Sequence, residues 1–286
     1  MTNNGYKAIL FDLDDTLYDC SGSLVATARR RAATAMVDAG LPCTQEDAYQ
    51  LQIQLQEKFG PRCNVFEEIA SEYQLDESFV HKALEAYNSD EVSNIEPFPD
   101  VIPTLQELRA KGFKLAIIST GVYRRQEKKI ELLGLRPYVD KVEIIDSERG
   151  LLKHYCFRQV LNELGVTADQ SMTVGDRVHA EIRIGKGFGM TTVQMLHGRF
   201  QQLMPEAEEE RPDFQIQQIS ELPAIINLAQ RQRVTGKPHI LAIGGGTGLP
   251  MVLRGLRRYT SNLTAVVTVT DSGRSSGMLR NELGIL

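Results

Sequence analysis

The sequence lacks any excess of basic residues, because 37 aspartates and glutamates outnumber 32 lysines and arginines and leave a net charge of -5. Proteins that bind a nucleic-acid backbone present a basic surface, so this balance argues against nucleic acid as a partner. Long apolar runs are also lacking: none approaches the roughly 18 residues of a membrane span, and the N-terminus has no charged segment leading into an apolar one. We therefore expect a cytoplasmic protein that contacts no membrane.

Cysteine is scarce, and none of the four cysteines has the paired spacing of a zinc site or a disulfide framework. They are Cys20, Cys43, Cys63 and Cys156. We expect them to be reduced and structural. His154, His179 and His197 share no metal-ligand spacing either, and we expect them at the surface or at helix ends.

The segment 7–18 reads KAILFDLDDTLY, an apolar run that stops on three carboxylates. Its nearly continuous apolar character from Lys7 to Leu13 predicts a central strand that is buried on both faces of a parallel sheet. Asp12 and Asp14 are two residues apart at the end of this strand, so their side chains start on one face, about 6 to 7 Å apart. Ligands bind at that edge of an open α/β sheet. We interpret Asp15 as a turn or cap residue.

After this strand the apolar period becomes helical and stays so to about residue 95. Apolar residues recur every four positions from Leu24 to Met36, and Thr44 with Asp47 forms a capping box in front of a second helix. Two more helical patterns follow, the last ending near residue 87. We therefore predict an all-helical insertion directly after the first strand.

Strand and helix patterns alternate from about residue 96 onward, which predicts a parallel, doubly wound α/β sheet. A chain of 286 residues also exceeds the usual size of one domain. We predict a core formed by 1–20 and 96–228, a helical cap over 21–95, a polar linker over 229–237 and a Rossmann-like βαβ segment over 238–286.

Four short motifs each fall at the C-terminal end of a predicted strand of the core. They are FDLDDTLY at 11–18, ISTG at 118–121, Lys153, and VGDRVHAEI at 174–182. Hydrolysis of a phosphate monoester needs a nucleophile, a proton donor for the leaving group and positive charge for the phosphoryl oxygens. Asp12 can act as the nucleophile, Asp14 as general acid and base, and Ser119 with Lys153 can bind the phosphoryl oxygens.

Two carboxylates beside a phosphate dianion would repel it, so such a site calls for a divalent cation. Mg²⁺ suits the oxygen ligands that Asp12, the Asp14 backbone carbonyl and Asp176 offer. The alternatives are a structural role for all four motifs, or a relative that has lost its activity.

The four motifs resemble those of the haloacid dehalogenase superfamily of phosphohydrolases over residues 7–228, and the helical insertion resembles that superfamily's small cap, which selects substrates. The resemblance implies Asp12 as nucleophile, Asp14 as general acid and base, Ser119 as phosphate ligand, Lys153 as charge stabiliser and Asp176 as metal ligand. Glu181 stands where the family usually has Asp, so its contact with the metal can be direct or through water. His154 stands where proline usually follows the lysine.

The segment from Ile240 to Gly248 reads ILAIGGGTG and predicts a strand, a glycine turn and a helix, which is the setting of a nucleotide phosphate site. No Gly-Lys-Ser/Thr follows, so the turn is not a P-loop. Asp271 ends the next predicted strand, where an acid can reach a ribose hydroxyl. For the glycines alone, a tight packing turn is the alternative.

Residues 238–286 resemble the start of the gluconeogenesis-factor family, relatives of the 2-phospho-L-lactate transferases. The resemblance implies a nucleotide-linked ligand, such as a nucleotide sugar. Its expected contacts are Gly244, Gly245, Gly246, Thr247, Gly248, Asp271, Ser272, Gly273, Ser275 and Ser276. Two strands and one helix cannot cover their own sheet, so we expect a truncated fusion protein.

The leading hypothesis is a Mg²⁺-dependent phosphomonoesterase that acts on a small phosphorylated metabolite and is fused to the start of a nucleotide-sugar-binding domain. One alternative is a ligand-binding regulator of carbon metabolism or cell shape, in which the N-terminal domain is accessory. A further alternative is a phospholactate-type transferase.

Overall fold

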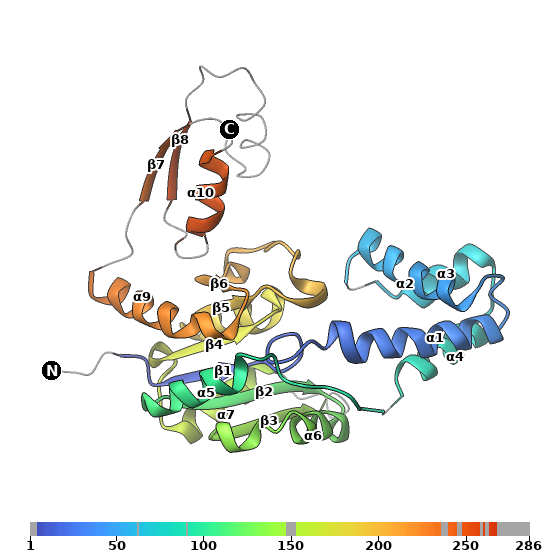
Figure 1. Ribbon diagram of the computed structural model, residues 1–286, viewed down its shortest axis with the longest axis horizontal. Helices are drawn as coiled ribbons and strands as arrows, with labels where there is room; N and C mark the ends of the chain where they lie inside the picture. Colours follow the sequence, from blue (N-terminus) through green and yellow to red (C-terminus); the bar gives the residue numbers. More distant parts are fainter. Residues whose placement is uncertain are drawn as a thin grey trace.

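The computed structural model describes residues 5–61, 63–89, 91–146, 153–235, 240–244, 248–257, 260 and 263–267. Within these ranges the chain forms a six-stranded sheet with flanking helices, a helical cap and a small two-stranded sheet (Figure 1). All four cysteines are free, as predicted. None of the helices in these ranges has the length and apolar character that crossing a membrane requires.

The core sheet is parallel throughout, in the order β3-β2-β1-β4-β5-β6. Its strands are β1 (Ala8–Phe11), β2 (Lys114–Gly121), β3 (Lys141–Asp146), β4 (Ser171–Gly175), β5 (Thr191–Met195) and β6 (Phe214–Ile216). The predicted central strand is confirmed, since β1 is fully buried between β2 and β4. The chain runs outward from β1 to β3 and then returns to β4 on the other side of β1. This switch point brings the ends of β1 and β4 together, where ligands bind in such sheets.

Helices cover both faces of the sheet, which confirms the doubly wound prediction (Figure 1). They are α5 (Val101–Ala110), α6 (Tyr123–Leu132) and α9 (Leu222–Thr235) on one face, and α7 (Lys153–Leu164) and α8 (Arg183–Phe188) on the other. Side chains alternate along β1: Ile9 and Phe11 pack with the first group, and Ala8 and Leu10 with the second. The sheet therefore has an apolar layer on each side.

The segment after β1 forms the predicted helical cap. A π-helical turn (Ser21–Val25) leads into α1 (Ala26–Asp38), α2 (Gln45–Phe59), α3 (Val65–Tyr73) and α4 (Glu77–Tyr87). Thr44 and Asp47 form the expected capping box at the start of α2. The cap has its own apolar core, and its two connections to the sheet domain meet where Tyr18 forms a β-bridge with Pro97.

The C-terminal described residues form the predicted βαβ arrangement. Its elements are β7 (Ile240–Gly244), α10 (Gly248–Arg257) and β8 (Leu263–Val267), with the two strands parallel. Leu249 and Leu253 of α10 are buried against one face of the sheet. Leu241, Ile243 and Val266 are exposed, so the described part has an uncovered apolar face.

The linker prediction needs correction. It begins at residue 229, but α9 continues to Thr235, so most of the predicted linker is helical. Arg233 stacks over the Tyr6 ring, 3.9 Å from its centroid, and donates a hydrogen bond to the Asp169 carbonyl. The polar sequence RQRVTGK did not indicate these contacts, which hold the last turns of the helix against the core.

Candidate active site

Asp12 and Asp176 each follow directly after one of two adjacent strands, β1 and β4. Their side chains are buried, with 4% and 2% of the residue surface exposed. The backbone N–H of Asp12 donates to the carbonyl of Val174 at 2.8 Å, which continues the strand ladder and fixes Asp12 beside β4. The first and fourth sequence motifs therefore meet at the switch point.

Lys153 joins the same site although it is the first residue of α7. Its Nζ lies 2.7 Å from Oδ1 of Asp12 and also donates to Glu181. Burial alone would lower the pKa of Lys153, but the negative charges of Asp12 and Glu181 raise it above its usual value. Lys153 therefore places a permanent positive charge against Asp12.

Glu181 is held by two cations. Besides Lys153, Arg177 donates from Nη2 to Oε1 of Glu181 at 2.8 Å, and this nitrogen lies 3.8 Å from Oδ1 of Asp12. Burial would raise the pKa of Glu181, but Lys153 and Arg177 hold it well below its usual range. A Cβ at Gly175 would lie 2.5 Å from Cγ of Glu181, so a glycine is required for the glutamate to cross the end of β4.

The positive charges near Asp12 and Asp176 do not offset the burial of these two carboxyl groups, and both pKa values are raised. Burial raises the pKa of Asp12 to about 7, and the negative charge of Glu181 adds a smaller effect in the same direction. The positive charges of Lys153 and Arg177 oppose this rise but do not cancel it. Burial and the nearby Glu181 and Asp12 likewise raise the pKa of Asp176. Oδ1 of Asp176 is buried and accepts no hydrogen bond from the described residues, and its ion-pair partner Arg177 lies 4.0 Å away.

This donor set fits a hard divalent cation such as Mg²⁺, which binds oxygen ligands and compensates buried carboxylates. Asp12 and Asp176 would hold it together with the backbone carbonyl of Asp14. Glu181 is less available than the sequence suggested, because Lys153 and Arg177 already occupy its Oε1, although its buried Oε2 accepts no hydrogen bond from the described residues.

Asp14 has a different environment from Asp12. Nζ of Lys129 lies 2.8 and 2.9 Å from its two carboxylate oxygens, the Tyr18 hydroxyl donates at 2.5 Å, and Gln126 donates at 3.3 Å. Although burial acts to raise the pKa of Asp14, the Lys129 charge and these hydrogen bonds hold it below its usual value. Ser119 is buried near the end of strand β2, where its Oγ accepts a hydrogen bond from Gln126 at 2.8 Å.

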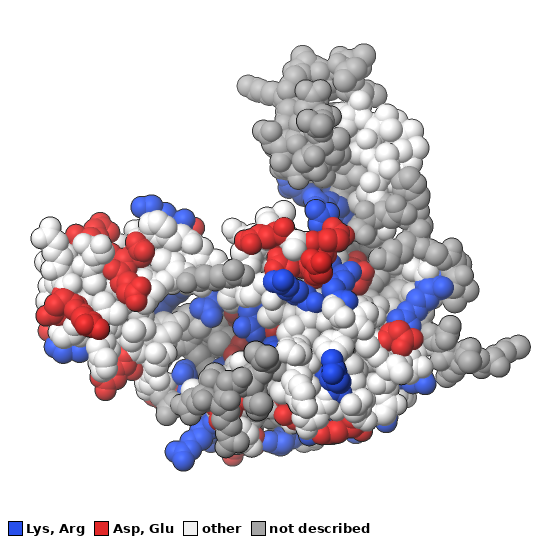
Figure 2. All heavy atoms as spheres, turned by 180° about the vertical axis from the view of Figure 1, so that it is seen from behind, with Lys and Arg blue, Asp and Glu red and all other residues white. Residues whose placement is uncertain are grey.

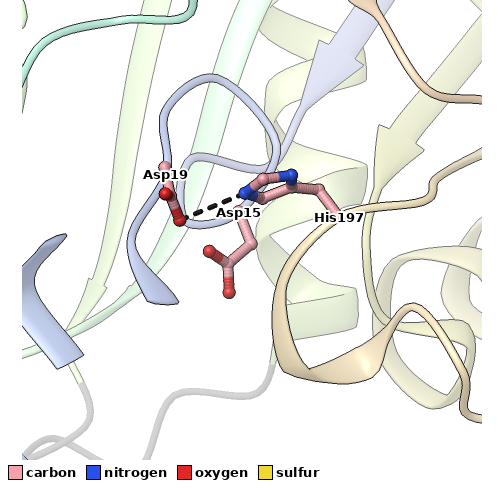
Figure 3. A group of neighbouring side chains, drawn as sticks. All are labelled: Asp15, Asp19 and His197. Carbon is pink, nitrogen blue, oxygen red and sulfur yellow. Dashed lines mark hydrogen bonds and ion pairs between the residues drawn. The ribbon is translucent and has the colours of Figure 1, made fainter. Parts of the chain in front are cut away.

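A cluster of two aspartates and a histidine begins within the first motif, and the sequence did not predict it. Figure 3 shows Asp15, Asp19 and His197, whose potential ligand atoms lie within 4.8 Å of one another. Asp15 has a φ of 55° and accepts hydrogen bonds from the N–H and hydroxyl of Ser21 at 2.7 and 2.6 Å, while His197 pairs with Asp19 at 3.1 Å. These hydrogen bonds account for the group, and they give Asp15 the turn role predicted for it. The hydrogen bonds from Ser21 connect the first motif to the first residue of the cap segment.

The predicted nucleotide contacts are described only in part. Gly244 ends β7 and Gly248 begins α10, which agrees with the expected order of strand, turn and helix. The other predicted contacts lie outside the described residues: Gly245, Gly246, Thr247, Asp271, Ser272, Gly273, Ser275 and Ser276.

Comparison with known proteins supports the division of the chain into two parts. Residues 6–189 match the family model for haloacid dehalogenase-like hydrolases, and residues 240–286 match the family model for the 2-phospho-L-lactate transferase CofD. Both matches agree with the resemblances seen in the sequence motifs.

Curated relatives of the longer part are similar over most of their length. The chain is 35% identical over 227 residues to the glyceraldehyde 3-phosphate phosphatase of Methanopyrus kandleri, which covers 77% of this chain and 97% of the relative. The C-terminal part is 62% identical over 61 residues to a Clostridium acetobutylicum protein named as a gluconeogenesis factor. That match covers 21% of this chain and only 14% of the relative.

Solved structures share the fold. A phosphatase structure from Clostridium difficile aligns with a TM-score of 0.60 at 19% identity, covering 78% of this chain and 99% of the other. A hydrolase structure from Bacillus subtilis, described as bound to magnesium, aligns with a TM-score of 0.54 at 22% identity, covering 78% and 99%.

Proposed function

The chain belongs to the haloacid dehalogenase-like hydrolase family and has named phosphatases among its relatives, and on that premise we propose that it is a Mg²⁺-dependent phosphomonoesterase of small cytoplasmic metabolites. One observation carries this proposal: a buried Asp12 lies 2.7 Å from the Lys153 ammonium and beside Asp176, which has a buried oxygen that accepts no hydrogen bond from the part of the chain that the structure describes. A nucleophile, a fixed positive charge and a metal ligand thus share one site.

In the first step an oxygen of Asp12 attacks the phosphorus, and the bond from phosphorus to the ester oxygen breaks. The leaving oxygen takes a proton from Asp14, and the phosphoryl group stays on Asp12 as an aspartyl-phosphate. This step requires the protonated form of Asp14, which Lys129 and Tyr18 disfavour. The hydroxyl of Ser119 donates to a phosphoryl oxygen, and Lys153 balances the negative charge.

In the second step a water molecule attacks the same phosphorus. Asp14, now ionised, takes a proton from this water, and the bond from phosphorus to Asp12 breaks to release inorganic phosphate. Lys129 and Tyr18 stabilise the ionised form of Asp14 that this step uses. Mg²⁺ bound by Asp12, Asp176 and the Asp14 carbonyl would supply the positive charge that lets a phosphate dianion approach these carboxylates.

The proposed leaving group is a short, hydroxylated carbon chain. A cavity of about 190 Å³ lies between the cap helices and Arg199, which follows β5 in the core, and Figure 2 shows Lys and Arg side chains in the recess between cap and core. Arg29 of α1 also lines the cavity, and none of its described lining residues is acidic. Gln52 of α2 lines it too, and its buried Oε1 accepts no hydrogen bond from the described residues, so it can accept one from a hydroxyl.

Glyceraldehyde 3-phosphate is the first substrate to test, because it fits this description and gives its name to the curated relatives. Release of inorganic phosphate from a panel of short phosphorylated metabolites would test the proposal. We expect glyceraldehyde 3-phosphate among the preferred compounds. Absence of turnover across the whole panel would contradict the proposed activity.

Arg199→Ala is expected to raise KM for glyceraldehyde 3-phosphate by about tenfold, because it removes a charged hydrogen-bond donor from the cavity that we propose for the leaving group. Turnover of p-nitrophenyl phosphate should change much less, since its leaving group lacks the hydroxyl and carbonyl. Arg211→Ala serves as the control, because Arg211 is exposed and pairs with Glu208 outside the cavity. Equal effects of Arg199→Ala on both substrates would exclude this assignment of the cavity.

The affinity for Mg²⁺ is expected to rise with pH through about 7. The pKa of Asp12 is raised to about 7, so below this pH the carboxyl group carries a proton that the cation must displace. Calorimetric titration with Mg²⁺ should show up to about tenfold weaker binding for each pH unit below 7. A constant affinity between about pH 6 and pH 8 would contradict a role of Asp12 as metal ligand.

For residues 240–286 we propose a nucleotide-linked ligand such as a nucleotide sugar, on the basis of the family match and the strand, turn and helix around Gly244 and Gly248. A role of the whole protein as a regulator or a transferase is proposed only through these relatives. Uridine diphosphate glucose should raise the melting temperature of the protein, and Gly248→Val should abolish the shift. An unchanged melting temperature at millimolar ligand would count against this proposal.

A further inference from the structure

Helix α6 carries two buried polar side chains, Gln126 and Lys129, whose exposed fractions are 2% and 7%. They are three residues apart and therefore lie on one face of the helix. Lysine is rarely buried unless it is paired, so the position of Lys129 calls for a specific partner.

That partner is Asp14. Nζ of Lys129 lies 2.8 and 2.9 Å from the two oxygens of its carboxylate, and the Tyr18 hydroxyl donates to Oδ1 at 2.5 Å. Because donors approach both oxygens, the plane and direction of the Asp14 carboxylate are fixed rather than left to rotate.

Gln126 links Asp14 to the phosphate-binding serine. Its Nε2 donates to Oγ of Ser119 at 2.8 Å, to the Thr120 carbonyl at 2.9 Å and to Oδ2 of Asp14 at 3.3 Å. A carbonyl and a carboxylate can only accept, so they define which end of the amide faces them. Since Ser119 Oγ accepts from Gln126, its own proton stays available for a phosphoryl oxygen.

The glycine of the ISTG motif gives independent support. A Cβ at Gly121 would lie 2.9 Å from Nε2 of Gln126, closer than real Cβ atoms approach, and 3.1 Å from its Cδ, so the Gln126 side chain would have to shift. The backbone of β2 thus approaches the amide so closely that only glycine leaves Gln126 in place.

We propose that Gln126 and Lys129 are positioning residues that couple phosphate binding at Ser119 to proton transfer at Asp14. Lys129 aims the Asp14 carboxylate at the leaving oxygen, and Gln126 directs the Ser119 proton to the phosphoryl group. This inference rests on the proposed phosphatase function, and it assigns different kinetic effects to the two residues.

Lys129→Met should affect substrates according to their leaving group. An alkyl phosphate such as glycerol 3-phosphate releases a strongly basic oxygen that needs the Asp14 proton, whereas p-nitrophenolate leaves without one. We expect kcat/KM, which reports the first step and not the hydrolysis of the shared aspartyl-phosphate, to fall at least about tenfold more for the alkyl than for the aryl substrate. Lys129→Arg, which keeps the charge, should recover much of the difference.

Gln126→Leu should weaken phosphate binding for every substrate. We expect about a tenfold rise in KM for both esters and in Kd for inorganic phosphate measured by calorimetry with Mg²⁺. Lys128→Met is the matched control, because Lys128 lies next to Lys129 in sequence but is exposed and pairs with Glu131. It should leave all these values unchanged.

Equal losses of kcat/KM on both esters in Lys129→Met would overturn the role of Lys129, and an unchanged phosphate Kd in Gln126→Leu would overturn that of Gln126. If the native protein hydrolyses neither ester, the proposed function fails along with the leaving-group role of Lys129. The phosphate titration still decides the role of Gln126 in that case, because it needs no turnover.

Discussion

Replacement of Asp12 by asparagine is expected to lower turnover of p-nitrophenyl phosphate by more than about 10³-fold. The amide cannot form the aspartyl-phosphate, so the loss should appear in kcat rather than in KM. Asparagine has nearly the same size as aspartate and can still accept a hydrogen bond from Lys153, which lies 2.7 Å from Oδ1. The buried site should therefore keep its shape.

Circular dichroism and the melting temperature would check that the Asp12→Asn protein is folded. Asp38→Asn is a suitable control, because Asp38 is an exposed residue at the end of α1 in the cap. A folded Asp12→Asn protein that keeps more than about a tenth of native turnover would exclude Asp12 as the nucleophile.

Removal of divalent cations with a chelator is expected to reduce turnover by more than about 100-fold, and added Mg²⁺ should restore it. Without a cation, the buried carboxyl groups of Asp12 and Asp176 favour the protonated state, as their raised pKa values indicate, and a protonated Asp12 is a poor nucleophile. Where they are ionised, they repel the incoming phosphate dianion. Full activity in the presence of the chelator would contradict this requirement.

Asp176→Asn should show whether the Asp176 side chain itself binds the metal. We expect it to raise the Mg²⁺ concentration for half-maximal activity by at least about tenfold, because an amide replaces an anionic metal ligand. The control is Asp169→Asn, since Asp169 is exposed and lies before β4 rather than after it. An unchanged Mg²⁺ requirement in Asp176→Asn would rule out a direct contact with the metal.

The sheet and the residues at its edge could be predicted from sequence, because both depend on local patterns. The apolar run before Asp12 predicts a central strand, and parallel strands bring their carboxyl ends to one edge whatever their distance along the chain. Asp12 and Lys153, which are 141 positions apart, therefore meet as expected.

The residues that surround these groups could not be predicted in the same way. Gln126 and Lys129 lie on a helix, and the direction of their side chains depends on the position and rotation of α6 against the sheet. A lysine within a polar helix also has the composition of a solvated surface. The role of Arg177 likewise depends on the π-helical turn of Val178–Ile182, which brings Glu181 back toward it.

In the cap, too, some features could be predicted from the sequence and others could not. Its helices and the capping box of α2 follow from sequence periodicity, whereas the cavity depends on how the cap lies against the core. Arg29 and Arg199 line this cavity from different units, and no sequence pattern connects them. The cluster of Asp15, Asp19 and His197 escaped prediction for this reason too, since His197 is 178 positions from Asp19.

The most direct test of the mechanism is to identify the residue that carries the phosphoryl group during turnover. The protein would be mixed with substrate and Mg²⁺, quenched in acid within the first turnover, digested and examined by peptide mass spectrometry. The mechanism predicts one phosphoryl group on Asp12, in the peptide that contains FDLDDTLY, and none in the Asp12→Asn protein. Phosphorylation of a different residue, or release of phosphate without any labelled peptide, would contradict it.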